Sequence, residues 1–269
     1  MNTFDVQQRE QRPSLRRVAV LGLGEAGGRI AADLAGSGVE VRAFDPDPGR
    51  DVESITRASD AVSAVAGCDV VLSVNSAKVA LDVAAGVLPG LDAGVVYADA
   101  NTASPELKRE LAALADEAGV GFADVALLGP VPTSGLRAPV LTSGPSARAF
   151  ADLFEPLGMP VEVVSGEAGD AAALKLVRSV FMKGVAASVV ESMQAAEALG
   201  RAVWLEREIE GLIGRRYFER ALEGSRKHAA RRVDEMEAAR DLLLELGVEP
   251  LVATASAAQL AGLATIEER

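Results

Sequence analysis

The sequence is poor in the residues that cross-link proteins or bind metals. Its 269 residues include one cysteine, Cys68, and one histidine, His228. A single cysteine excludes an internal disulfide framework. Without a second histidine, an H-E-x-x-H pattern or a cysteine cluster, we expect no metal site and no Ser/His/Asp triad with another base. We expect Cys68 to be a small core residue and His228 to be a solvated residue of a charged helix.

The sequence also lacks a long apolar run and an excess of basic residues. No uninterrupted apolar segment is long enough to span a bilayer, and the start, MNTFDVQQREQRPS, has no apolar signal core. The formal net charge of −12 gives no general attraction to nucleic acid or to an anionic membrane. We therefore predict a cytoplasmic protein that binds neither, although a local basic pocket for an anionic small molecule is compatible with this charge.

Aromatic residues make up only 4% of the chain, whereas hydrophobic residues make up 49%. Small aliphatic side chains must fill the core, which suits α/β and all-α packing. Short apolar runs alternate with helical patterns such as 26–38 and 77–88, and this alternation predicts a doubly wound, mostly parallel sheet. The expected strands are 16–22, 39–44, 69–74, 94–99, 120–125, 138–143 and 160–165.

After Gly166 the strand signals stop and helical patterns follow one another. The first is one long pattern over 171–200, which ends at a glycine. Further helices are expected over 203–213, 226–247 and 254–266. This half is therefore predicted to be all α, with a domain boundary at Ser165–Gly166.

Three glycines stand where the first strand should end, in VAVLGLGEAG over 18–27. Gly22, Gly24 and Gly27 match G-x-G-x-x-G between a strand and a helix. In this pattern the first glycine allows the tight turn, the second lets the backbone approach a pyrophosphate, and the third lets the helix pack closely on the strand. The pyrophosphate would lie on the helix N-terminus. We expect residues 22–27, with Leu23, Glu25 and Ala26 between the glycines, to bind a dinucleotide.

An acidic residue closes the second expected strand. Asp45 follows Gly24 by 21 residues, where a carboxylate can accept hydrogen bonds from the adenosine ribose and repel a 2′-phosphate. This spacing favours NAD. Arg42 and Arg50 keep NADP possible, because either could reach a 2′-phosphate.

The sequence thus predicts a flexible tail over 1–14, a Rossmann NAD(P)-binding domain over 15–165 and an all-helical substrate and dimerisation domain over 166–269. In open α/β sheets, ligands bind at the carboxyl ends of the strands. We therefore expect Asn75 near the nicotinamide ribose, and Asn101 and Thr102 near the ring or the substrate. Helix capping is the alternative role for Thr102.

Several segments resemble the β-hydroxyacid dehydrogenases, a family with 6-phosphogluconate dehydrogenase as a larger relative. VAVLGLGEAGGRIAADLAGSGVEVRAFD is similar to the family's cofactor fingerprint, VVYADANTASPELKRELA to its D-x-S-T-x-x-P segment, and APVLTSG to the strand after its substrate loop. The resemblance covers nearly the whole chain after the tail. It is greatest to the branch with a short phosphogluconate-dehydrogenase-type C-terminal domain, and it implies a homodimer or larger assembly through the helical half.

The resemblance also implies roles for particular residues. The family's catalytic lysine lies early in the long helix, in a G-x-x-x-K-x-x-N-N type pattern, and GDAAALKLVRS places Lys175 there, with Arg178 and Ser179 in place of the two asparagines. The family's P-V-S-G-G carboxylate loop is similar to GPVPTSGLRAP over 129–139. There Ser134, Gly135 and Arg137 would bind an anionic group. A surface turn is the alternative interpretation of this loop.

The long helix supports the lysine from its own pattern. Lys175, Ser179 and Lys183 share one stripe with Arg178 beside it, so Arg178, Ser179 and Lys183 are further candidate substrate residues. The opposite surface carries Leu174, Val177, Phe181, Val185 and Val189. We expect this apolar surface to be mostly buried and the stripe to face a polar cleft. The alternative is a solvated helix face.

Lysine chemistry fits oxidation of an alcohol, in which a hydride leaves carbon and a proton leaves the hydroxyl. A neutral lysine can take that proton, and an ammonium can return it. We expect burial, Arg178 and Lys183 to lower the pKa of Lys175. The predicted function is an NAD(P)-dependent oxidoreductase acting on a small hydroxy acid or related alcohol. The alternatives are C=N reduction of the imine reductase type and a dinucleotide-binding protein without turnover.

Overall fold

The computed structural model describes residues 15–267, so the predicted tail over 1–14 lies outside the described residues. Contacts divide the chain after Ala172 into two compact units. We call residues 15–172 the sheet unit and residues 173–267 the helical unit, and each is described by itself. One helix, α8 (Asp170–Ala198), begins in the sheet unit and continues through the helical unit. The domain boundary placed at Ser165–Gly166 from the sequence therefore falls shortly before this helix.

One eight-stranded sheet forms the centre of the sheet unit, in the order β3-β2-β1-β4-β5-β6-β7-β8. Only the β6–β7 pair is antiparallel. The prediction of a mostly parallel sheet is confirmed, and all seven expected strands are present. The two-residue strand β3 was not predicted, because so short a segment carries no periodic pattern. The strands are β1 (Arg17–Leu21), β2 (Glu40–Phe44), β3 (Thr56–Arg57), β4 (Val70–Ser73), β5 (Val96–Asp99), β6 (Gly121–Leu127), β7 (Val140–Ser143) and β8 (Val161–Val163).

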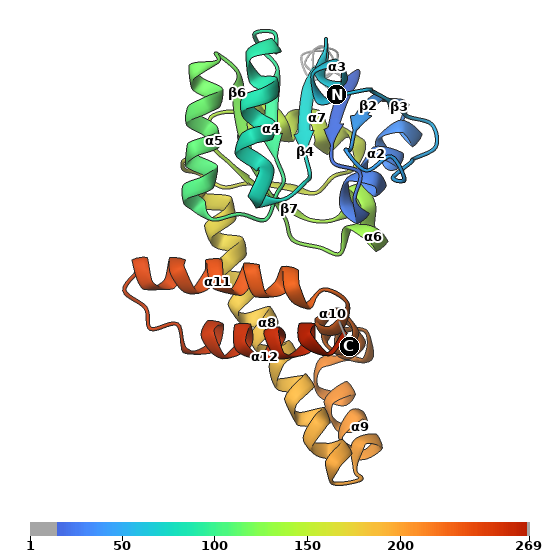
Figure 1. Ribbon diagram of the computed structural model, residues 1–269, viewed down its shortest axis with the longest axis vertical. Helices are drawn as coiled ribbons and strands as arrows, with labels where there is room; N and C mark the ends of the chain where they lie inside the picture. Colours follow the sequence, from blue (N-terminus) through green and yellow to red (C-terminus); the bar gives the residue numbers. More distant parts are fainter. Residues whose placement is uncertain (1–14, 268–269) are drawn as a thin grey trace, which may run out of the picture. The chain divides into compact units, whose positions relative to one another are not determined.

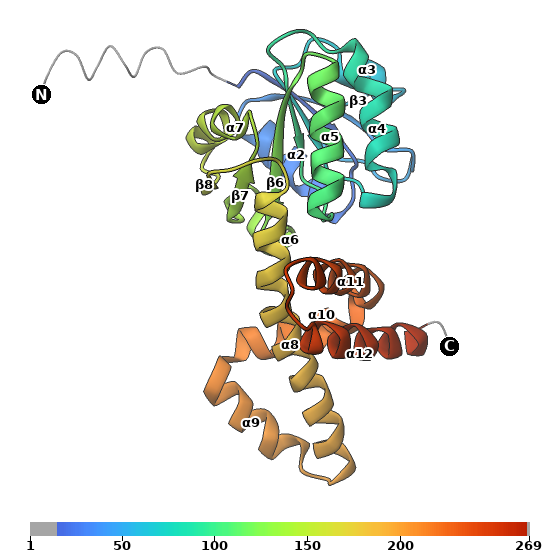
Figure 2. The same ribbon diagram turned by 90° about the vertical axis from the view of Figure 1, so that its left-hand side faces the viewer.

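Helices cover both faces of this sheet (Figures 1 and 2). Alternate residues of each strand point to opposite faces. Val18 and Val20 of β1 therefore belong to the core under α2 (Glu25–Gly36) and α7 (Ala147–Phe154). Ala19 and Leu21 belong to the core under α3 (Ala61–Val65), α4 (Ala80–Val87) and α5 (Pro105–Glu117). Cys68 lies in this second core with 4% exposure, and burial raises the pKa of its thiol to about 11.

Short helical segments complete the sheet unit. They are η1 (Ala77–Val79), η2 (Leu88–Gly90), α6 (Val131–Ser134), η3 (Gly135–Arg137) and η4 (Glu155–Leu157).

The helical unit contains the rest of α8 together with α9 (Ala202–Ile213), α10 (Arg215–Lys227), α11 (Ala229–Glu245) and α12 (Leu251–Glu267). The single helix expected over 226–247 is in fact interrupted. His228 breaks it with a backbone φ of −126° and ψ of 28°, although neither glycine nor proline marks the position. His228 is half-buried and lies at this break between two helices, not within one charged helix. Within residues 15–267, no helix combines the length and apolarity needed to cross a membrane.

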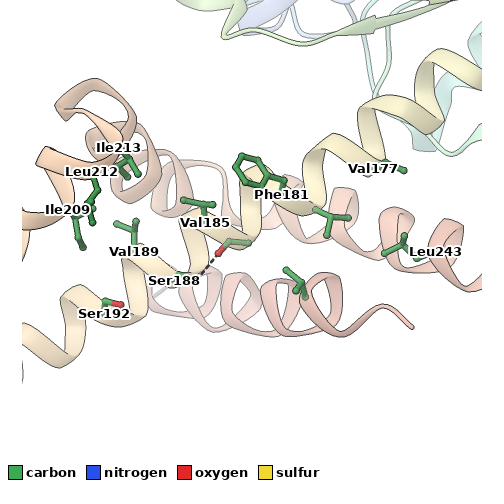
Figure 3. Close-up of a pocket in the computed structure, with 13 residues that line it drawn as sticks. Val177, Phe181, Val185, Ser188, Val189, Ser192, Ile209, Leu212, Ile213 and Leu243 are labelled. Carbon is green, nitrogen blue, oxygen red and sulfur yellow. Dashed lines mark hydrogen bonds between the residues drawn. The ribbon is translucent and has the colours of Figure 1, made fainter. Parts of the chain in front are cut away.

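The expected burial of α8 is reversed over its first three turns. Leu174, Val177 and Phe181 are 48%, 45% and 68% exposed, whereas Ser179 on the polar stripe is 1% exposed. The reason is that α11 lies against the polar stripe and supplies a buried acidic partner, described below. The apolar surface of α8 instead borders a groove of about 670 Å³ with α9, Leu243 and Val252 (Figure 3).

Candidate functional site

The glycine turn between β1 and α2 is built from very close backbone contacts. Gly22 has a φ of +103°, and a Cβ on it would overlap the carbonyl oxygen of Val74, which follows β4. A Cβ on Gly27 would overlap the carbonyl oxygen of Gly22. These two glycines therefore have the turn and packing roles that the sequence predicted for them.

Gly24 is under a different constraint. It is the N-cap of α2 with φ −62° and ψ −171°, a conformation that other residues adopt, and no described side chain caps the helix. A Cβ on Gly24 would meet only the Nη1 atom of Arg50, at 2.8 Å. Because this atom ends a flexible side chain, Gly24 is not required by packing. The helix start and its dipole are arranged to receive an anion.

Asp45 is bound to this turn directly. Its Oδ2 atom accepts a hydrogen bond from the Leu23 amide at 2.7 Å, and its Oδ1 atom accepts one from the Asp47 amide at 2.9 Å. Arg57 donates to the carbonyl oxygens of Asp45 and Asp47 at 2.6 and 2.8 Å. Asp45 is only 8% exposed, so it fixes the end of β2 against the glycine turn and retains lone pairs for a further donor.

Arg42 and Arg50, the two arginines that could reach the 2′-phosphate of NADP, each form an ion pair near this site. Arg42 lies 3.4 Å from the carboxylate of Glu40, and Arg50 lies 3.3 Å from that of Asp47. All these side chains are partly exposed.

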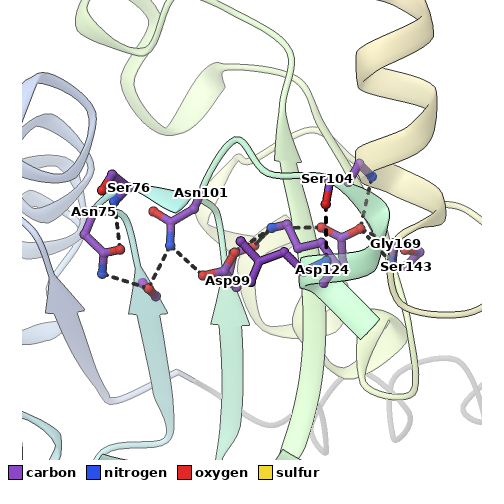
Figure 4. A network of polar contacts seen from close by, with 12 residues as sticks. Asn75, Ser76, Asp99, Asn101, Ser104, Asp124, Ser143 and Gly169 are labelled. Carbon is purple, nitrogen blue, oxygen red and sulfur yellow. Dashed lines mark hydrogen bonds and ion pairs between the residues drawn. The ribbon is translucent and has the colours of Figure 1, made fainter. Parts of the chain in front are cut away.

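A second polar cluster lies at the carboxyl ends of β4 and β5 (Figure 4). The amides of Asn75 and Asn101 both donate to the Ser73 hydroxyl at 3.1 Å, and Asn101 also donates to Asp99 at 2.6 Å. Asn101 is 4% exposed, and its Oδ1 atom has no hydrogen-bond partner among the described residues. A ligand group at this atom must therefore be a donor. The structure thus brings two predicted cofactor residues together through Ser73.

The same cluster continues into the interior through Lys108. Its ammonium lies 2.6 Å from Asp99 and 3.1 Å from Asp124, with all three side chains at most 1% exposed. Burial works to lower the pKa of Lys108, but the two carboxylates outweigh burial and raise it. Asp124 also accepts hydrogen bonds from the amides of Gly169 and Ala172 at 3.2 and 3.0 Å. This carboxylate therefore fixes the first turn of α8.

The predicted substrate loop lies against α2. A Cβ on Gly135 would overlap the carboxylate of Asp33, and that carboxylate accepts the Leu136 amide at 3.0 Å. The anionic group that the backbone of this loop binds is therefore the Asp33 carboxylate of the protein itself. Arg137 is exposed and forms no ion pair with the described residues, and Ser134 is half-buried. The assignment of Ser134, Gly135 and Arg137 to substrate stays a prediction.

In the helical unit, the polar stripe of α8 meets Glu235 of α11. The Ser179 hydroxyl donates to the Glu235 carboxylate, and the Lys183 ammonium lies 2.8 Å from it. Burial works to raise the pKa of Glu235, but the charges of Lys183 and Lys175 and the two hydrogen bonds lower it to about 2. Burial lowers the pKa of Lys183, with smaller contributions from Arg232 and Arg231, against the opposing effect of Glu235.

The expectation that this whole stripe opens to a cleft was therefore wrong for Ser179 and Lys183, which Glu235 engages from within the same unit. Lys175 is half-buried and Arg178 is exposed. Glu235 was not recognised from the sequence, since it is one of several acids in RRVDEMEAARD. No group of three or more side chains suited to a metal ion occurs in the described range.

Family models match both halves of the chain. Residues 17–158 match the NAD binding domain of 6-phosphogluconate dehydrogenase, and residues 196–263 match a domain of unknown function, DUF1932. The first match covers more than half of the chain and includes the glycine turn. The fold and this match define a dinucleotide-binding protein that takes NAD(P).

Individual relatives give the same assignment. A solved conserved protein of unknown function, described as structurally similar to 3-hydroxyacid dehydrogenases, is 31% identical, with 92% of this chain and 96% of that chain covered and a TM-score of 0.68. A probable 3-hydroxyisobutyrate dehydrogenase of Mycobacterium tuberculosis is 28% identical over 191 residues, which are 68% of this chain and 65% of that protein, so slightly less than two thirds of its length. A reductive aminase from Aspergillus terreus, solved with NADPH, has a TM-score of 0.65 over 89% of this chain and 90% of that chain at 18% identity, which shows a common fold alone. The chain belongs to the β-hydroxyacid dehydrogenase and 6-phosphogluconate dehydrogenase-like superfamily.

The described residues fit an NAD(P) cofactor. The uncapped start of α2 beside Gly24 suits a pyrophosphate, Asp45 has lone pairs for ribose hydroxyls, and the partnerless Oδ1 atom of Asn101 suits a hydrogen-bond donor at the nicotinamide end.

Gly24→Ala tests the approach of the pyrophosphate. We expect the midpoint of thermal unfolding to stay within about 3 °C of the wild type, because packing does not require this glycine. We expect the dissociation constant of NAD(P)H, measured by fluorescence titration, to rise at least about tenfold, since a Cβ would displace the phosphate. Gly36→Ala is the control, because a Cβ there meets nothing within 4 Å. Unchanged affinity in Gly24→Ala would place the phosphate elsewhere.

Lys108→Met tests the buried ion cluster. Removing the ammonium leaves two buried carboxylates without their cation, so we expect the free energy of unfolding to fall by about 3–5 kcal/mol in urea titrations. Arg109→Met is the control, because Arg109 is half-exposed and pairs with Glu106 on the surface of the same helix. Its effect should stay below about 1 kcal/mol. Equal effects of the two substitutions would contradict the predicted contribution of the buried Lys108 ion pairs to stability.

Proposed function

We propose that this protein is an NAD(P)-dependent oxidoreductase that interconverts a small anionic hydroxy acid, or a related alcohol, with its carbonyl form. The observation that carries the proposal is the glycine turn at the start of α2, where Gly24 has no side chain and is not needed for packing. The family membership and the dehydrogenases among the relatives support the reaction type. We also propose a cytoplasmic location, with which a single buried cysteine, Cys68, is compatible.

Lys175 is the proposed general acid and base. The bound cofactor would supply or accept the hydride. In the oxidative direction the neutral amine of Lys175 takes the hydroxyl proton, and in the reductive direction its ammonium protonates the carbonyl oxygen. In both directions the alcohol and its carbonyl form differ by one hydride and one proton, and Lys175 would exchange the proton.

Substrate binding is proposed for residues that can meet an anion. Arg178 and Arg137 are exposed cations that form no ion pair with the described residues, and Thr102 is half-buried close to Asn101 in sequence. Substrate binding by Ser134 and Gly135 stays a prediction. Ser179 and Lys183 contribute to substrate binding only indirectly, because both donate hydrogen bonds to Glu235.

The choice between NAD and NADP is proposed to depend on Asp45. A carboxylate at the end of β2 favours ribose hydroxyls over a 2′-phosphate, so NAD is the expected cofactor. NADP stays possible through Arg50, which lies over Gly24 and is half-exposed. Binding titrations with both reduced cofactors decide the preference.

Two other functions would use the same fold. Reduction of a C=N bond would show as NAD(P)H oxidation with a ketone and an amine together but not with either alone. A dinucleotide-binding protein without turnover would bind the cofactor and leave a broad panel of hydroxy acids and alcohols unchanged. The lysine at position 175 favours the alcohol and carbonyl reaction.

Lys175→Met tests the proposed function. Screening the wild type with NAD and NADP against hydroxy acids, including 3-hydroxyisobutyrate, should identify a substrate by absorbance at the reduced nicotinamide band. We expect kcat to fall about 10²–10⁴-fold in the variant, the usual contribution of a general acid or base, with cofactor affinity unchanged. Lys227→Met provides a lysine control. Full activity of Lys175→Met would remove the proposed mechanism.

We also propose that the helical unit binds a second copy of the chain. Among the described residues, twelve of the fifteen exposed large hydrophobic side chains lie in this smaller unit, with Phe181 at 68% and Leu212 at 84% exposure at the groove. Covering them would bury several hundred Å² of apolar surface by order of magnitude, comparable with the roughly 800 Å² per partner of a stable interface. Phe181 and Leu212 line one groove together with other apolar side chains, and a contiguous exposed apolar surface is typical of an interaction site.

Phe181→Asp combined with Leu212→Asp tests this assembly. We expect the wild type to have the mass of a dimer or larger at micromolar concentration in light scattering, and the double variant to shift to the monomer mass, because carboxylates would be desolvated in the interface. Val62→Asp is the control on the sheet unit, where Val62 is 56% exposed on α3. A monomeric wild type, or a variant that keeps its mass, would contradict the proposal.

A further inference from the structure

The segment between β2 and β3, residues 45–55, lies beside α2 (Figure 1). Its hydrophobic side chains Val52 and Ile55 pack against the core under α2, and a Cβ on Gly28 would lie 3.4 Å from Val52. Two prolines in DPDPGR restrict its backbone further. This loop therefore has a defined position next to the helix that follows the glycine turn.

One arginine holds the loop through its backbone. Arg57 of β3 donates to the carbonyl oxygens of Asp45 and Asp47 at 2.6 and 2.8 Å. It also donates to the carbonyl oxygen of Arg50. A guanidinium is a rigid planar group with several N–H donors, so one side chain can satisfy all of these acceptors. The backbone from which the Arg50 side chain extends is therefore fixed.

The Arg50 side chain reaches from this backbone to the glycine turn. Its Nε atom donates to the Asp47 carboxylate at 3.3 Å, and a Cβ on Gly24 would lie 2.8 Å from its Nη1 atom. The Gly49 amide and the Arg50 guanidinium lower the pKa of Asp47, which keeps the pair charged. Neither Nη atom of Arg50 has a hydrogen-bond acceptor among the described residues. The Nη end of the guanidinium therefore has donors left for a ligand beside the start of α2.

The position of Arg50 against Gly24 distinguishes the two phosphate groups that it could meet. The middle glycine of a G-x-G-x-x-G turn is where the backbone approaches the diphosphate, whereas the ribose with its 2′ position lies at the acid that closes the second strand. Here that acid, Asp45, is bound to the amides of Leu23 and Asp47. A diphosphate close to the carboxylates of Asp45 and Asp47 also needs a cation, and a guanidinium can donate to two phosphate oxygens at once.

We propose that Arg50 binds the diphosphate of NAD(P) together with the start of α2, and that Arg57 is a positioning residue that holds Arg50 there. This inference rests on the NAD(P) binding of the proposed function, and it is independent of the reaction assigned to Lys175. It makes Arg50 a requirement for NAD and NADP alike. Discrimination between the two cofactors is left to Asp45.

Arg50→Met tests the contact with the diphosphate. Isothermal titration calorimetry with NADH, NADPH and ADP-ribose should show dissociation constants that rise about tenfold or more for all three, because each ligand loses a charged hydrogen bond. ADP-ribose lacks the nicotinamide, so its loss assigns the effect to the adenosine diphosphate half. Arg148→Met is the matched control, an exposed arginine that pairs with Asp152 on α7, and should leave all three constants unchanged.

Other outcomes of this titration would overturn the inference. A loss confined to NADPH would assign Arg50 to the 2′-phosphate, and unchanged constants would remove it from the site. Because Arg50 is half-exposed, we expect Arg50→Met to keep the midpoint of thermal unfolding within about 3 °C of the wild type. A change in affinity then reports the lost contact and not a loss of folding.

The role of Arg57 is tested by a double-mutant cycle. Arg57→Met should raise the dissociation constant of NADH in the wild-type background by a factor at least about threefold larger than in the Arg50→Met background, because Arg57 acts through Arg50. A merely structural role would give the same factor in both backgrounds. Equal factors would therefore overturn the positioning role.

The same measurements separate this inference from the proposed function. A wild type that binds neither NADH nor NADPH would overturn both. A wild type that binds and oxidises or reduces a substrate, with Arg50→Met binding equally well, would overturn the inference alone. Full activity of Lys175→Met would remove the proposed mechanism and leave the contact between Arg50 and the diphosphate standing.

Discussion

The ammonium of Lys108, held between the carboxylates of Asp99 and Asp124, is the contact on which the functional edge of the sheet unit depends. Asp99 positions the amide of Asn101, and Asp124 binds the backbone at the start of α8. All these groups are buried, so water cannot replace a lost partner. Their geometry is therefore fixed before any ligand binds, which is what an electrostatically preorganised site requires.

The helical unit contains a similar but smaller buried ion cluster. There Glu235 holds the Ser179 hydroxyl and the Lys183 ammonium, and its pKa is lowered to about 2, so it is charged at all ordinary pH values. The helix α8 takes part in both clusters, through its first turn at Asp124 and through its stripe at Glu235. Lys175 lies between these two fixed segments of one helix. The amine proposed for proton transfer is thus carried by the part of α8 with the most defined polar contacts.

Local patterns predicted the features that depend on local interactions. The strands, the glycine turn and the link between Asp45 and that turn follow from apolar runs and spacing, and the structure contains them. Features that depend on a distant partner were missed. Lys108 lies in ELKREL, which has the pattern of a surface helix, and only Asp99 and Asp124 make its burial possible. Similarly, nothing near α8 indicates that α11 covers its polar side, so the burial of Ser179 and the exposure of Phe181 could not be derived.

The three glycines of the turn serve two separate purposes, with a consequence for how such sequences change over time. A side chain on Gly22 or Gly27 would overlap a backbone carbonyl, whereas a side chain on Gly24 would meet only the end of the Arg50 side chain. A descendant that stopped using dinucleotides would still need the first and third glycines to fold, and selection would relax at the second alone. The residue at the middle position of the motif therefore distinguishes a turn that still binds a dinucleotide from one that only maintains the fold.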